Sequence, residues 1–195
     1  MATSRENKSI SMFKSALIGG GARPNLFEVE LTSIPQGVEW SAENFRYMCK
    51  AASLPAQNIA AIDVPFRGRI FKVAGDRTID TWTVTIINDE GFALRNAFEQ
   101  WTEQIAKLSN NLGATNPSEY MTNATVYQLG RGSTASSKTS DGEENVVLKE
   151  YEFQEIFPTN VSAIDLSYDT GDTIEEFTVE FQVNSISNTG AGDPN

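Results

Sequence analysis

Residues 78–88 read TIDTWTVTIIN, and this stretch decides the fold class. It is rich in threonine, valine, isoleucine and tryptophan, the side chains that fit a pleated, half-buried sheet. Two faces alternate along it: Trp82, Val84 and Ile86 on one, and Thr81, Thr83 and Thr85 on the other. The pattern predicts a strand with one face in a core and the other toward water.

Shorter stretches on both sides of this strand carry similar signals. The predicted strands are 25–31, 45–54, 59–65, 70–73, 123–129, 146–157, 161–166 and 174–183. Turns are predicted at Gly68, at Gly75-Asp76 and at 169–172. Leaving aside 161–166, whose pattern is the weakest, these stretches and residues 78–88 give a chain of about eight strands joined by short turns.

One helix is predicted, over about Glu90–Ser109. Its apolar side chains recur at helical spacing and form one stripe: Leu94, Ala97, Phe98, Trp101, Ile105 and Leu108. Asn88 or Asp89 is the predicted N-cap. The predicted fold class is therefore mainly β, an antiparallel β-sandwich or barrel with one packed α-helix.

The domain organisation is simple. Residues 1–24 are polar and then glycine-rich, which predicts a flexible N-terminal arm. Residues 25–185 form the predicted sandwich domain, and residues 186–195 a polar C-terminal tail. Residues 130–145 contain no large apolar side chain and are interpreted as a mobile loop inserted in the domain.

The composition argues against most enzymes. The chain has no histidine and one cysteine, Cys49, so the usual general base near neutral pH and the histidine-based metal sites are missing. Asp169-Thr170-Gly171 spells the aspartic-protease triplet, but turn chemistry explains it better. We expect no catalytic residue, no cofactor and no metal site.

The formal charge is −11, which disfavours binding to nucleic acid phosphates. The acidity alone is explained by solubility. No stretch approaches the roughly 20 apolar residues of a membrane helix, and the first 25 residues contain no secretory apolar region. We expect a protein made in the cytoplasm, with no membrane contact.

Several blocks of the sequence resemble the tail tube family of T4-like contractile phages, over roughly residues 20–185. The blocks are GARPNLFEV from Gly21, CKAASLP from Cys49, VPFRGR from Val64, GDRT from Gly75 and WTVTIIND from Trp82, followed by the helix and by residues 116–129. Their order and spacing carry the resemblance. The loop 130–145 looks longer than the turn of the family.

The resemblance implies a structural protein of the virion tail. Subunits of that family form hexameric rings, and one sheet from each subunit joins its neighbours in a β-barrel around a lumen. The rings stack, helped by a flexible arm or loop, inside a contractile sheath, and double-stranded DNA passes through without specific binding. The implied partners are further copies of the chain, the sheath protein, and the baseplate and tail terminator proteins.

Two sets of residues are candidates for functional roles. The candidate subunit contacts are Arg23, Asn25, Arg67, Arg69, Asp76 and Arg77. Arg67, Arg69 and Arg77 are basic residues in an acidic chain, which suits either a solvated turn or a contact with carboxylates of a neighbour. The candidate lumen-facing residues are Glu150, Glu152, Thr178, Glu180 and Gln182. Alternation shows which of them share a face, not which face looks inward.

Three alternatives remain open at this level. Two are close relatives: the tube protein of a phage-derived injection or type VI-like secretion system, and the baseplate protein that initiates the tube. The third is a lipocalin-like small-molecule-binding barrel, which would be monomeric with an apolar pocket.

Overall fold

The computed structural model describes residues 10–17, 20–31, 33–35, 37–139, 142–169 and 171–190, with backbone alone over 132–139, 142–145 and 189–190. The helices are α1 (Ile10–Ala16), α2 (Ala42–Met48), α3 (Ala93–Ile105) and a 3-10 turn (Pro117–Glu119). The strands are β1 (Phe27–Glu30), β2 (Cys49–Ala52), β3 (Gln57–Phe66), β4 (Arg69–Ile79), β5 (Trp82–Ile87), β6 (Thr122–Thr139), β7 (Gly142–Val161), β8 (Glu176–Gln182) and β9 (Ser185–Gly190).

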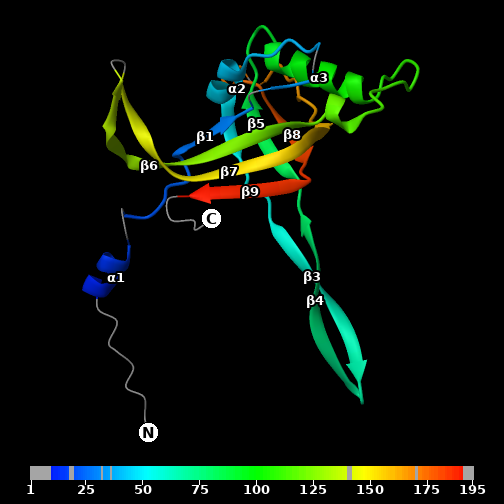
Figure 1. The fold of residues 1–195 in the computed structure, drawn as a ribbon. Coiled ribbons are helices and arrows are strands. Elements are labelled where there is room, and N and C mark those ends of the chain that lie inside the picture. The colour runs from blue at the N-terminus through cyan, green and yellow to red at the C-terminus, as the bar shows by residue number, and fades with distance from the viewer. Residues whose placement is uncertain are drawn as a thin grey trace.

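The main sheet is antiparallel and bends back on itself at β7. Its order is β1-β6-β7-β8-β5-β2, and β9 pairs with β7. The first part of β7 pairs with β6 and β9, and its last residues pair with β8 (Figure 1). We call these parts the β6 half (β1, β6, β9 and β7 up to Gln154) and the β8 half (β2, β5, β8 and β7 from Phe157). The predicted antiparallel β-sandwich is confirmed.

Aromatic side chains fill the space between the two halves. Trp82 of β5 lies 4.9 Å, between ring centroids, from Phe153 of the β6 half and 5.1 Å from Phe181 of β8. Phe98 of α3 closes the core with ring contacts to Trp40, Phe45, Trp101, Phe177 and Phe181. Because Trp82 touches both halves, their outer faces point in opposite directions.

The bend in β7 is made by a β-bulge at Glu155. This residue adopts a left-handed conformation with φ 54°, and its N–H donates to Asn123 Oδ1 at 3.0 Å. The register shifts at this point, so that Phe153 and Ile156 are both buried although they are three residues apart. Because of the bulge, the side chains of β7 that face the core change from the odd-numbered ones before Glu155 to Ile156 after it, so that β7 can belong to both halves.

Replacing Glu155 with glycine is expected to raise the free energy of unfolding by about 0.5 to 1 kcal/mol. Glycine removes the left-handed strain of about 1–2 kcal/mol and loses about half of that, roughly 0.5–1 kcal/mol, because its unfolded state has more conformational entropy. Urea unfolding measures the change. Gln154→Gly, one residue earlier in β7, is the control and should destabilise. Equal losses for both variants would contradict the role given to the bulge.

Residues 45–48 are helical, so the predicted strand 45–54 is wrong over its first half. Ser41 caps α2, since its Oγ accepts from the Asn44 N–H at 3.3 Å and its carbonyl from the Phe45 N–H. The helix buries Phe45 in the core and leaves Tyr47 exposed. Only the second half of the prediction, β2, is extended.

The predicted helix exists but is shorter than expected. It begins at Ala93, with Phe92 as N-cap at φ 52°, and not at Asn88 or Asp89. Asp89 still accepts from the Ala93 N–H at 3.2 Å. The stripe through Leu94, Ala97, Phe98 and Trp101 is buried, whereas Leu108 lies beyond the helix end and is 89% exposed. The prediction that Leu108 belongs to the stripe is wrong.

Several segments predicted as turns or loops are strands. Gly75-Asp76 lies inside β4, and the break expected at that turn falls instead at Asp80-Thr81, inside the predicted strand 78–88. The backbone of the predicted loop 130–145 pairs as the end of the β6–β7 hairpin. The predicted tail contains β9. Conversely, residues 162–166 are not a strand, and the predicted arm contains the short helix α1.

Candidate subunit interfaces

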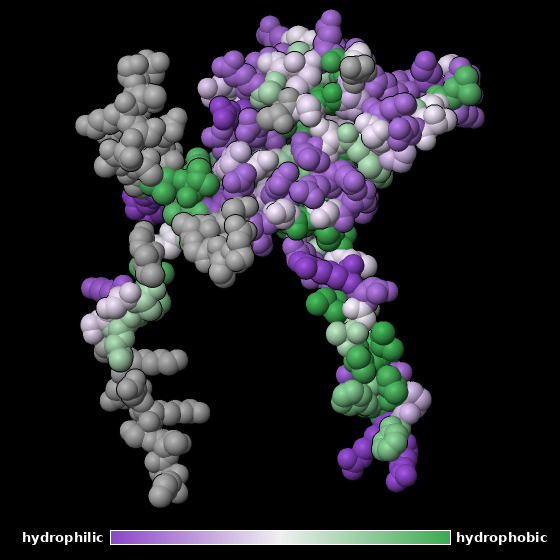
Figure 2. Space-filling view, viewed as in Figure 1, coloured by the Kyte–Doolittle hydropathy of each residue, from purple (hydrophilic) through white to green (hydrophobic). Residues whose placement is uncertain are grey.

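The β3–β4 hairpin projects from the sandwich and has one apolar face. Cross-strand pairs fix its faces: Ile62↔Val73, Val64↔Phe71 and Phe66↔Arg69 lie on one side, and Asp63↔Lys72 and Pro65↔Ile70 on the other. All of these side chains are exposed. Figure 2 shows hydrophobic side chains gathered along this projection. We call Ile62, Val64, Phe66, Phe71 and Val73 the hairpin apolar face.

A tight turn at the tip presents two arginines. Arg67 and Gly68 have φ 46° and φ 81°, the pattern of a two-residue turn that suits hairpin twist. The Arg67 guanidinium lies 5.3 Å from the Phe66 ring centroid, and Arg69 pairs with Phe66. The tip therefore combines two cations with the end of the apolar face.

The predicted subunit contacts fall in three separate places. Arg67 and Arg69 lie together at the tip, while Asp76 and Arg77 lie near the base of β4. Arg77 is eight residues from Arg69, or roughly 26 Å at 3.3 Å per strand residue. Arg23 and Asn25 lie beside β6, where Gln128 Nε2 donates to the Arg23 carbonyl at 2.9 Å.

Charge is divided unevenly between the projecting parts and the sandwich. Residues 57–79 carry four basic and two acidic side chains, and the described residues 10–17 and 20–24 carry two basic side chains, Lys14 and Arg23, and no acidic one. Residues 25–56 and 80–195 together carry 23 acidic and seven basic side chains. The hairpin and α1 project from the same side of the sandwich, away from α2 and α3 (Figure 1). The side of the molecule that carries the hairpin and α1 is thus basic and apolar, whereas the sandwich is acidic.

The predicted lumen-facing residues lie on two opposite outer faces. Thr178, Glu180 and Gln182 alternate with the buried residues of β8, so they lie on the outer face of the β8 half. Glu150 and Glu152 lie on the outer face of the β6 half, since they flank Tyr151 and precede the buried Phe153. The two groups cannot both line one lumen.

The outer face of the β6 half is acidic around a tyrosine. Tyr127 pairs with Glu28 and Glu150 on neighbouring strands, and its hydroxyl lies 3.3 Å from Glu30 Oε2. Burial, followed by the negative charges of Glu30 and Glu150, raises the pKa of Tyr127 above its ordinary value. Glu28 is also paired with Arg46 of α2 across the β1 edge.

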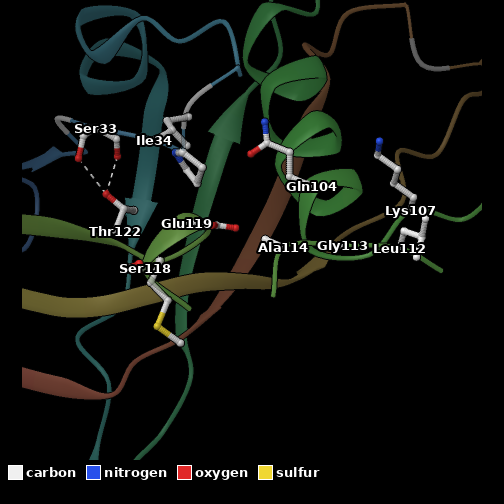
Figure 3. A pocket seen from close by; sticks show the side chains of 12 residues that line it. Ser33, Ile34, Gln104, Lys107, Leu112, Gly113, Ala114, Ser118, Glu119 and Thr122 are labelled. Atoms are coloured by element: carbon white, nitrogen blue, oxygen red, sulfur yellow. Dashed lines mark hydrogen bonds between the residues drawn. The ribbon is translucent and has the colours of Figure 1, made fainter. Parts of the chain in front are cut away.

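A groove of about 800 Å³ lies at the C-terminal end of α3 (Figure 3). Ile34, Leu112 and Met121 contribute apolar surface, and Glu119 contributes a carboxylate. Thr122 Oγ1 donates to the Ser33 carbonyl at 2.6 Å and fixes one wall. The groove is open and lies outside the sandwich, whose described interior is filled by aromatic side chains. The lipocalin-like alternative, which needs an interior pocket, is not supported.

The chemistry available to these surfaces is limited. Among the described residues, no group of three or more Cys, Asp or Glu side chains is arranged so that it could hold a metal ion. Burial raises the pKa of Cys49 to about 12, so its thiol is protonated and a poor nucleophile at neutral pH. None of the described helices is long and apolar enough to cross a membrane.

Sequence reasoning missed the hairpin apolar face. The signal was present, since Ile62, Val64 and Phe66 alternate with polar or small residues, as do Phe71 and Val73. The expected turn at Gly75-Asp76, and the short bounds of the predicted strands 59–65 and 70–73, hid the fact that these stretches belong to two long paired strands.

Comparison with known proteins shows which sequences and structures this chain is similar to. A family model described as phage tail tube protein matches residues 22–186. Tail tube protein gp19 of Enterobacteria phage T4 is 39% identical over 161 residues, which cover 83% of this chain and 88% of that protein. A chain of the sheath-tube complex of an extracellular contractile injection system shares the fold, with TM-score 0.58 and 13% identity over 95% of this chain and all of that one. A chain of the anti-feeding prophage baseplate gives TM-score 0.56 and 12% identity over 87% and 96%.

Proposed function

Because this chain belongs to the phage tail tube protein family, we propose that it closes into hexameric rings that stack into a hollow conduit for double-stranded DNA. The observation that carries the proposal is the 39% identity to a phage T4 tail tube protein across most of both chains. The role is structural, in the virion tail, and involves no catalysis. Sheath, baseplate and tail terminator proteins are the other partners.

The direction of the hairpin favours one face as the lumen wall. The hairpin continues β2 and β5, so these strands and β8 run along its direction, while β6, β9 and the first part of β7 run across it (Figure 1). If the hairpin reaches the next ring, its direction is that of the tube axis. Barrel strands are tilted by about 35–45° from the barrel axis, so the β8 half suits a wall around that axis. Thr178, Glu180 and Gln182 then face the DNA.

This face suits a conduit that does not bind its cargo. It presents threonines from β5 and β8 together with Glu176 and Glu180. β5 and β8 carry no basic side chain, and Lys50 of β2 is already paired with Glu176 at 2.5 Å. Each cation added to the wall would neutralise a phosphate and strengthen DNA binding. A polar, acidic wall lets DNA slide with little adhesion.

Electron microscopy of the purified protein, alone and with isolated baseplates, tests the proposal. We expect tubes of one diameter with sixfold symmetry. Glu180→Lys with Gln182→Lys should make the tubes retain DNA at low salt and slow ejection, whereas Glu150→Lys with Glu152→Lys should leave ejection near normal. A protein that stays monomeric with baseplates present would overturn the tube proposal, and the reverse lysine result would assign the lumen to the β6 half.

A further inference from the structure

The strands of the β8 half carry one lysine, and a carboxylate holds it. Lys50 Nζ lies 2.5 Å from Glu176 Oε1, and the two side chains are 53% and 34% exposed. Strands β2, β5 and β8 and residues 157–161 of β7 carry no other basic side chain. The one cation of these strands is therefore accessible to solvent, but it is already paired.

An irregularity in β2 places Lys50 on the outer face. The register between β2 and β5 shifts between Cys49 and Ala51, so Lys50 is the extra residue. A bulge of this kind changes the direction of a side chain that regular alternation would place on the other face. Lys50 then reaches across β5, which lies between β2 and β8 in the sheet, to Glu176 at the start of β8.

We propose that Glu176 is a positioning residue for DNA passage, because it holds the Lys50 ammonium against the wall and away from the phosphates of the passing duplex. The inference rests on the proposed tube with the β8 half as its lumen wall. It goes beyond the general acidity of that wall, since it gives one carboxylate a task that the other carboxylate on β8 outside the core cannot perform.

Ring symmetry multiplies the effect of a single lysine. In the proposed hexamer each ring carries six copies of Lys50 at one height, and every stacked ring repeats them. An ammonium released from its partner can contact a phosphate, displace a counterion and strengthen DNA binding. Contacts that are weak singly add up along one duplex. An exposed ion pair contributes little to the stability of a subunit, so the value of this pair lies in the charge that it cancels.

Glu180 offers a matched comparison on the same strand. It lies four residues after Glu176 and shares its face. None of the ion pairs among the described residues involves Glu180. Removing either carboxylate changes the charge of the wall by the same amount, but only the loss of Glu176 releases a cation.

The test compares tubes of the full chain carrying Glu176→Gln, Glu180→Gln, or Lys50→Gln together with Glu176→Gln. The measurements are the retention of a short labelled DNA duplex by the tubes at low salt and the rate of DNA ejection from phage particles that carry each variant. Glu176→Gln is expected to raise retention about tenfold and to slow ejection, with the excess retention lost as salt is raised. Glu180→Gln and the double variant should stay within about twofold of the wild type, since neither leaves a free ammonium. The thermal melt of all three subunits should be unchanged, because the pair is exposed.

Four outcomes overturn the proposal. If Glu176→Gln behaves like Glu180→Gln, Glu176 does not shield the DNA, although the tube function stands. If the double variant retains DNA as strongly as Glu176→Gln, the effect comes from the lost tie between β2 and β8 and not from a released lysine. If lysines placed at Glu150 and Glu152 retain DNA and those placed on β8 do not, the lumen lies at the β6 half and the inference falls with that assignment. If the wild type forms no tubes with baseplates present, the tube and the shielding fail together.

Discussion

The double substitution Ile62→Ser with Phe71→Ser is expected to abolish tube formation while the subunit stays folded. Both side chains belong to the hairpin apolar face and are 54% and 67% exposed in the subunit. Burying each against a neighbour is worth about 1.5–3 kcal/mol, so the critical concentration should rise at least a hundredfold. The measurement is the yield of sedimentable tubes over a range of concentrations, with circular dichroism to confirm the fold.

The opposite face of the same hairpin supplies the control. Ile70 is 65% exposed, almost the same as Phe71, but pairs with Pro65 on the other side. Ile70→Ser should therefore leave tube yield within about twofold of the wild type, since Ile70 lies on the face that stays in solvent if the hairpin apolar face makes the contact. If Ile70→Ser disrupts tubes and the double variant does not, the docking face has been assigned to the wrong side.

Phe98→Ala is expected to lower the free energy of unfolding by about 3–5 kcal/mol, the range for removing a large buried aromatic side chain. The ring is fully buried and contacts five other aromatic rings contributed by α2, α3, β8 and the segment before α2. In a chain of this size the melting temperature should fall by roughly 10 °C. Urea unfolding and calorimetry measure both values.

Leu108→Ala tests where α3 ends. The sequence pattern includes Leu108 in the buried stripe, whereas the structure leaves it 89% exposed beyond the end of α3. The substitution should change stability by less than about 0.5 kcal/mol. If Leu108→Ala lowered the free energy of unfolding nearly as much as Phe98→Ala, Leu108 would be buried, and the longer helix predicted from the sequence would be correct.

The elements that sequence reasoning predicted well are those with one face in the core. Along β5 and β8, buried residues alternate with half-buried ones, because a sheet with a dry side and a wet side imposes a period of two. The stripe of α3 was readable for the same reason. A hydrophobic pattern indicates which side chains are buried, and these elements are stabilised mainly by burying their apolar side chains.

The elements that were missed are held by backbone pairing or lie on an edge. β9 is a polar strand whose pairing with β7 leaves little hydrophobic trace. Pro65 is tolerated in β3 because an edge strand has N–H groups that no neighbour needs. The helix α2 depends on its Ser41 cap more than on periodicity. The candidate interfaces share this difficulty, since an alternating apolar face looks the same in a core and in a contact between subunits.

The exposure of the β3–β4 hairpin has a consequence for when tubes form. A two-stranded ribbon without further packing is only marginally stable in water, so its amide hydrogens should exchange quickly in the free subunit and slowly in a tube. If the hairpin docks on the next ring, the first contact between two free subunits must order the ribbon and form the interface at the same time. A preformed docking surface removes part of that entropic barrier. Growth is then favoured on an existing ring over spontaneous initiation in solution, which keeps the timing and place of polymerisation under the control of a template.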